Sequence, residues 1–163
     1  MRTVTVTWQP EQDRFEARGT HPVAIPINAP HGGGPATGFS ATELLLAGAG
    51  SCSTWDVVEI MRKARQDLTG LDVEVVGEQA AEEPWEYRRL WLRFTFHGRG
   101  ISQEHAERAV SLSVDKYCSV LATLRGVAAV ETEVVVVEEP SESGEHEETS
   151  TYPTSPDNDM PPA

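Results

Sequence analysis

The sequence predicts an α+β fold in which helices pack against a largely antiparallel sheet. Two observations lead to this prediction. The expected elements follow the order strands, long helix, strands, second helix and final strand. The chain has 163 residues, which suits one domain with a tail. A chain of this length buries a sufficient core without disulfides or metal ions.

Three strands are expected before the first helix. Residues 4–8 (VTVTW) alternate with a period of two, and residues 13–18 and 23–27 are two further strand candidates. Residues 28–39 (NAPHGGGPATGF) form a loop by composition, because successive glycines and prolines hold neither a ladder nor a helix. We expect the glycine-rich centre of this loop to act as a flexible lid or a dimer contact.

The first helix is expected from Ser40 to about Gln66, with Gly70 as a stop signal. Ser40 and Glu43 match the capping-box pattern, in which each side chain satisfies a free amide of the first turn. The first half of the helix is small and apolar on nearly every side, which is typical of a buried helix. Residues 48–51 (GAGS) lower helix propensity, so we expect another backbone or a partner helix to approach closely there.

Two strands are expected next, at residues 71–79 and 86–97. The second is the strongest in the chain, because large apolar residues occupy every other position. The members of this apolar face are Leu90, Leu92, Phe94 and Phe96. The opposite face carries Arg89, Trp91, Arg93 and Thr95.

The last two elements are a helix and a strand. Ser102 is expected to cap the helix, which either runs unbroken to Arg125 or breaks near residues 117–119. Residues 129–139 contain VVVV and are expected to form a strand that is buried on both faces or lies at an edge.

The formal net charge is −13, from 26 acidic and 13 basic residues. Eight of the acids lie in residues 138–163, which contain no Lys or Arg, so the first 137 residues carry only −5. We therefore expect a domain at residues 1–139 and an acidic disordered tail at residues 140–163. The charge argues against nucleic acid as the main partner and against an anionic membrane surface. We find no apolar run of membrane-spanning length and no segment of signal-peptide type, so a cytoplasmic, reducing location is expected.

The chemistry of the chain centres on its two cysteines, Cys52 and Cys118. In a reducing compartment a static disulfide is not expected, so they are either buried free thiols or a redox pair. A redox pair requires one activated thiolate and a second thiol that resolves its sulfenic acid. Lys116, close to Cys118, could favour a thiolate there by its charge. The five histidines show no metal-ligand spacing, so neither a metal nor a cofactor is expected.

Two segments carry a family resemblance. GFSATELLLAGAGSCSTWDVVEIMRK and LSVDKYCSVLATL resemble the OsmC/Ohr family, named for osmotically inducible protein C and organic hydroperoxide resistance protein, and are closest to its YhfA-like subgroup. The resemblance implies a two-layer α+β homodimer with swapped elements and its central helices packed in the middle. It also implies thiol-dependent reduction of organic hydroperoxides, with Cys52 as the peroxidatic and Cys118 as the resolving cysteine of an intrasubunit disulfide. A lipoyl- or thioredoxin-type dithiol would then reduce that disulfide.

The chain departs from the family pattern beside the first cysteine. Peroxidases of the family have a glutamate ten residues before it, and this chain has Thr42 there. Glu43 is a tentative catalytic residue, although the capping box already explains it. The family's arginine falls to Arg14 or Arg18 by region only, and either could be a solvated strand residue. These departures motivate an alternative function, a non-catalytic dimeric module that binds an apolar small molecule in the same pocket, which Trp55 would line.

Overall fold

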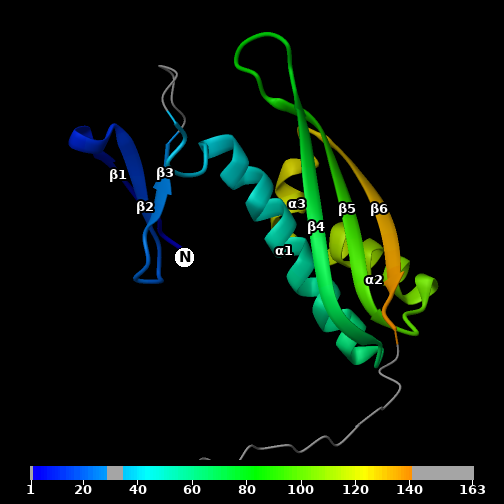
Figure 1. The fold of residues 1–163 in the computed structure, drawn as a ribbon. Coiled ribbons are helices and arrows are strands. Elements are labelled where there is room, and N and C mark those ends of the chain that lie inside the picture. The colour runs from blue at the N-terminus through cyan, green and yellow to red at the C-terminus, as the bar shows by residue number, and fades with distance from the viewer. Residues whose placement is uncertain (1, 29–34, 141–163) are drawn as a thin grey trace, which may run out of the picture.

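A computed structural model of the chain describes residues 2–28 and 35–140. The predicted acidic tail from residue 140 and the glycine-rich centre of the predicted loop lie largely outside these residues. The described residues fold into two three-stranded sheets and three α-helices, and Figure 1 shows that the first sheet stands apart from the rest. None of the helices in the described segments is long and apolar enough to cross a membrane.

The N-terminal sheet consists of β1 (Thr5–Gln9), β2 (Arg14–Arg18) and β3 (Ile25–Ile27), joined in that order as antiparallel neighbours. A short 3-10 helix, η1 (Pro10–Gln12), connects the first two strands. Paired residues of an antiparallel ladder share a face, so the pairs formed by Trp8 with Phe15 and by Phe15 with Ile27 build one apolar face. None of the described residues covers this face, and Trp8 is 59% exposed.

The long helix α1 (Ala41–Lys63) begins with the predicted capping box. The backbone N–H of Glu43 donates to Ser40 Oγ at 3.1 Å, and the Ser40 N–H donates to Glu43 Oε2 at 2.7 Å. The helix ends three residues before the predicted end at Gln66, because Arg65 adopts a left-handed conformation with φ 55°. Gly70, expected as the stop signal, lies instead inside the next strand.

The second sheet consists of β4 (Asp67–Gln79), β5 (Tyr87–Arg99) and β6 (Ala129–Glu138). β4 and β5 are antiparallel, like the neighbouring strands of the first sheet, so the strands are largely antiparallel as expected, and β5 and β6 form the one parallel pair among the described strands. The reason is the crossover: the chain leaves the end of β5, returns through the helices, and enters β6 in the same direction. β6 is an edge strand, one of the two positions expected for it.

The core lies between this sheet and the helices. The predicted apolar face of β5 is confirmed, with Leu90, Leu92, Phe94 and Phe96 each at most 1% exposed. Figure 1 shows α1 along β4 and α2 (Gln103–Leu112) near β6. The second predicted helix is broken, which was one of the two alternatives. It consists of α2, a five-residue π turn η2 (Ser113–Tyr117) and α3 (Ser119–Leu124).

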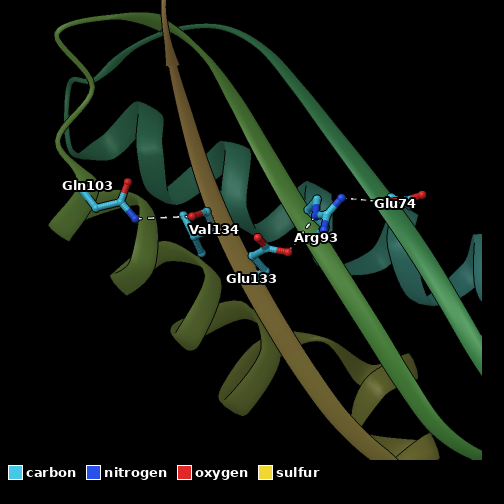
Figure 2. Close-up of polar contacts among 5 residues, drawn as sticks. All are labelled: Glu74, Arg93, Gln103, Glu133 and Val134. Carbon is cyan, nitrogen blue, oxygen red and sulfur yellow. Dashed lines mark hydrogen bonds and ion pairs between the residues drawn. The ribbon is translucent and has the colours of Figure 1, made fainter.

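The opposite face of the second sheet is covered by ion pairs. Figure 2 shows Arg93 of β5 between Glu133 of β6 and Glu74 of β4, with N···O distances of 2.7 and 3.6 Å. At the edge of the sheet, Gln103 Nε2 of α2 donates to the carbonyl oxygen of Val134 at 3.5 Å. This face therefore combines ion pairs with exposed apolar residues such as Val76 and Val137, and the two thiols lie on the helical side of the sheet.

Candidate functional site

The π turn places Cys118 beside α1. The Cys118 N–H donates to the Ser113 carbonyl oxygen at 2.8 Å, which closes the wide turn. Ser113 Oγ in turn donates to the Ser53 carbonyl oxygen of α1 at 2.9 Å, and both serine side chains are fully buried. This hydrogen bond fixes the π turn against the helix that carries Cys52. A turn of this kind inside a helical segment is frequent at functional sites.

Cys118 is also the N-cap of α3. Its sulfur accepts the backbone N–H of Leu121 at 3.4 Å, and the residue is 1% exposed. The first turn of a helix has backbone N–H groups without intrahelical partners. One of these is satisfied by the Cys118 sulfur, and the others are available to a neighbouring acceptor.

Cys52 is that neighbouring acceptor. It lies in the middle of α1, is half-buried, and packs against the edge of the core. Its sulfur is 3.9 Å from Ser119 Oγ, a distance at which sulfur still takes part in a hydrogen bond. Hydrogen bonding from the Val120 N–H and the Cys118 thiol also lowers the pKa of Cys52. The structure therefore brings the two predicted cysteines together, although they come from separate helices.

The two thiols differ in acidity. Burial opposes the charged form of Cys52, but hydrogen bonds from the Val120 N–H, the Cys118 thiol and Ser119 outweigh it, so the pKa of Cys52 lies below its ordinary value. Burial raises the pKa of Cys118 to about 11. Cys52 is therefore the more acidic of the two thiols, and Cys118 is the one that more readily keeps its proton.

The suggested effect of Lys116 on Cys118 is wrong. The Lys116 ammonium lies 5.3 Å from the ring centre of Tyr117, where it makes a cation–π contact. Burial of the Cys118 sulfur has the largest effect on its pKa and raises it, whereas the predicted effect of the Lys116 charge was to lower it.

Glu43 is occupied at the start of α1. Both of its hydrogen bonds in the capping box are to Ser40, which also lowers the pKa of its exposed carboxyl group. Thr42 Oγ1 lies 3.1 Å from Ser40 Oγ, so it too takes part in the local cap. The structure thus gives Glu43 a capping role and no polar contact with Cys52 in the described residues.

The two candidate arginines lie on the N-terminal sheet. Arg18 forms an ion pair with Glu16 at 3.0 Å, and Arg14 is half-buried. No hydrogen bond or ion pair joins either arginine to Cys52 within residues 2–28 and 35–140.

The functional groups that sequence reasoning missed are the hydroxyl of Ser119 and the N–H of Val120. The serine stands inside the KYCS motif, directly after the second cysteine, and this was its only signal.

The surface beside Cys52 is apolar and open. Leu45, Gly48, Cys52 and Trp55 follow one another at helical spacing along the outer side of α1. Trp55 is 73% exposed, and a Cβ added at Gly48 would meet nothing within 4 Å. Among the described residues, no three His, Cys, Asp or Glu side chains gather as a metal site. The arrangement suits thiol chemistry on an apolar molecule.

Comparisons with known proteins agree with this picture. Protein YhfA of Escherichia coli (strain K12) is 41% identical over 81 residues, which are 50% of this chain and 60% of that protein. The crystal structure of a hypothetical protein from Aquifex aeolicus VF5 matches with a TM-score of 0.75 and 26% identity over 86% of this chain and 98% of that one. An organic hydroperoxide resistance protein from Legionella pneumophila matches with a TM-score of 0.61 and 17% identity over 83% and 97% of the two chains, a likeness of fold alone.

The family itself is established by a match that covers more than half of the chain. The family model described as OsmC-like protein matches residues 32–133, a range that includes both cysteines. The predicted α+β fold and the predicted resemblance are thereby confirmed. The chain belongs to the OsmC-like protein family.

Proposed function

We propose that this protein is a thiol peroxidase that reduces organic hydroperoxides, with Cys52 as the peroxidatic and Cys118 as the resolving cysteine. The observation that carries the proposal is the position of Cys52 on α1 beside the Cys118–Ser119 turn, with 3.9 Å between the Cys52 sulfur and Ser119 Oγ, together with a lowered pKa of Cys52 and a raised pKa of Cys118. A peroxidase needs a thiolate to attack and a nearby protonated thiol to resolve the product. Some structural relatives are named organic hydroperoxide resistance proteins, which supports the same chemistry.

In the first step the Cys52 thiolate attacks the distal oxygen of the hydroperoxide. An S–O bond forms, the O–O bond breaks, and the alkoxide leaves and takes a proton from water to become the alcohol. Cys52 is oxidised to the sulfenic acid, and the peroxide is reduced. The open apolar surface with Leu45 and Trp55 offers a place for the organic part of the substrate.

In the second step Cys118 resolves the sulfenic acid. Its sulfur attacks the Cys52 sulfur, the S–O bond breaks, and the hydroxide takes the proton of the Cys118 thiol and leaves as water. The product is an intrasubunit disulfide. A dithiol of lipoyl or thioredoxin type would reduce it by thiol–disulfide exchange, and a cytoplasmic location would keep that donor reduced.

The proposal includes a homodimer. The apolar face of the N-terminal sheet and the outer side of α1 are both left uncovered by the described residues, and contiguous apolar patches of this kind mark interaction sites. A second copy that exchanges its N-terminal sheet would cover these surfaces.

The catalytic part is tested by mixing reduced protein with cumene hydroperoxide in a stopped-flow instrument. We expect two thiols to be lost for each peroxide consumed. Cys52→Ser should abolish turnover, and Cys118→Ser should stop at the sulfenic acid, which a dimedone probe traps. If Cys52→Ser consumes peroxide as fast as the natural protein, the mechanism is wrong. If the natural protein binds apolar molecules but consumes no peroxide, the chain is the non-catalytic binding module instead.

The dimer is tested by sedimentation over a range of protein concentrations. Trp8→Glu places a charge on the apolar face of β1 and should produce a monomer. The matched control is Thr5→Glu on the opposite face of the same strand, where it would oppose Arg18 and leave the assembly intact. A natural protein that is monomeric throughout would contradict the proposal.

A further inference from the structure

The hydroxyl of Ser119 has a defined position beside the reactive sulfur. Ser119 is the first residue of α3, directly after Cys118, and its Oγ lies 3.9 Å from the Cys52 sulfur. In the described part of the chain, this sulfur is the one hydrogen-bond partner of the hydroxyl. The carbonyl of Ser119 is engaged separately, as the acceptor of Thr123 Oγ1 at 2.8 Å.

The position matters because, among the described residues of one chain, no charged side chain forms a hydrogen bond or an ion pair with Cys52. Glu43 is held by Ser40, and Arg18 is held by Glu16. The donors that this chain places beside Cys52 are therefore neutral, and a hydroxyl can serve because it supplies one O–H donor and rotates to suit its acceptor. Hydrogen bonds to a charged group are stronger than those between neutral groups.

We propose that Ser119 is a catalytic residue of this site, whose hydroxyl donates to the Cys52 sulfur and stabilises it as the reactive thiolate. The inference rests on the proposed function for its purpose in turnover. The hydrogen bond itself can be measured without any peroxide. Ser119 is exposed, and Cys52 beside it is half-buried.

The tether between α3 and α1 supports this geometry. Ser113 Oγ fixes the π turn to the Ser53 carbonyl oxygen, and the π turn ends at Cys118. The first turn of α3 is therefore held at a fixed distance from Cys52, so the Ser119 hydroxyl does not need to be ordered when the thiolate forms.

The test is the pH dependence of Cys52 alkylation by iodoacetamide, followed peptide by peptide with mass spectrometry. Ser119→Ala should raise the midpoint by about one pH unit, which is the loss of one hydrogen bond to a charged acceptor. At a pH below both midpoints, the variant then holds about tenfold less thiolate. Ser119→Thr keeps the hydroxyl and should restore the midpoint of the natural protein.

The matched control is Thr123→Val, which removes a hydroxyl one turn further along α3 that does not touch Cys52. It should leave the midpoint unchanged. The inference is overturned if Ser119→Ala has the same midpoint of Cys52 alkylation as the natural protein, or if Thr123→Val raises that midpoint as much as Ser119→Ala does. If Ser119→Ala shifts the midpoint but the natural protein consumes no peroxide, the proposed function fails and the role of Ser119 at the thiolate stands. If the natural protein consumes peroxide but Ser119→Ala causes no shift, the role of Ser119 fails and the proposed function stands.

Discussion

Replacing Val120 by proline removes a single backbone donor from the thiolate. The Val120 N–H is the strongest of the hydrogen-bond donors that lower the pKa of Cys52. It belongs to the first turn of α3, where backbone N–H groups have no partner inside the helix. Proline is tolerated in a first turn, so Val120→Pro deletes the donor while α3 remains.

The size of the effect follows from the charge on the acceptor. A hydrogen bond to a charged group contributes about 1.5–3 kcal/mol, and one pKa unit corresponds to about 1.36 kcal/mol, so the pKa of Cys52 should rise by about one to two units. Val120 also packs against the core, and its side chain is partly lost in the variant. Val120→Ala is the reference, because it shortens the same side chain and keeps the N–H.

The assay is a pH titration of thiolate absorbance in the ultraviolet, with circular dichroism to show that both variants are folded. The difference between Val120→Pro and Val120→Ala reports the loss of the Val120 donor together with the restriction that proline places on the backbone of the preceding Ser119. If the two variants titrate together, the backbone amide does not hold the thiolate, and the explanation of the acidity of Cys52 fails.

Three further outcomes are expected. Gly98→Ala should destabilise the fold by about 2–4 kcal/mol in urea unfolding, because its Cβ would lie 2.1 Å from a main-chain oxygen of β4. The control is Gly126→Ala, which should change stability little, because its Cβ would meet its nearest atom at 3.9 Å. Glu43→Ala should lower the melting temperature slightly and leave the titration of Cys52 unchanged; a shifted titration would give the carboxylate a role at the thiolate. Since the pKa of Cys118 is raised from 9.0 to about 11 in the folded state, its stabilising contribution is present below pH 9 and is lost as the pH rises to 11. The stability of the natural protein should therefore fall relative to Cys118→Ala over that window, and parallel curves would contradict the burial of the thiol.

Local patterns in the sequence predicted the elements well. The alternation in β5 identified its buried face, and the serine–glutamate pair at Ser40 located the start of α1. The end of α1 was placed too late because Gly70 was given the role of a stop, while the left-handed residue is Arg65. A non-glycine residue in that conformation has no reliable signal in a single sequence.

The candidate site was predicted in part. The cysteines came from the family resemblance, and the structure brings them together. The thiolate donors were missed because they depend on contacts between α1 and α3, which are distant in sequence. The effect of Lys116 was predicted with the wrong sign, since proximity in sequence said nothing about the burial of Cys118.

The sequence by itself determined the element order, the capped start of α1, the buried face of β5 and the two thiols, because each follows from residues close together in the chain. Only the tertiary structure decided the parallel entry of β6, the place of Ser119 beside Cys52, and the burial that sets the acidity of Cys118 apart from that of Cys52. Direction and acidity depend on which groups the crossover brings together and which it removes from water. Those are long-range properties that a local pattern does not contain.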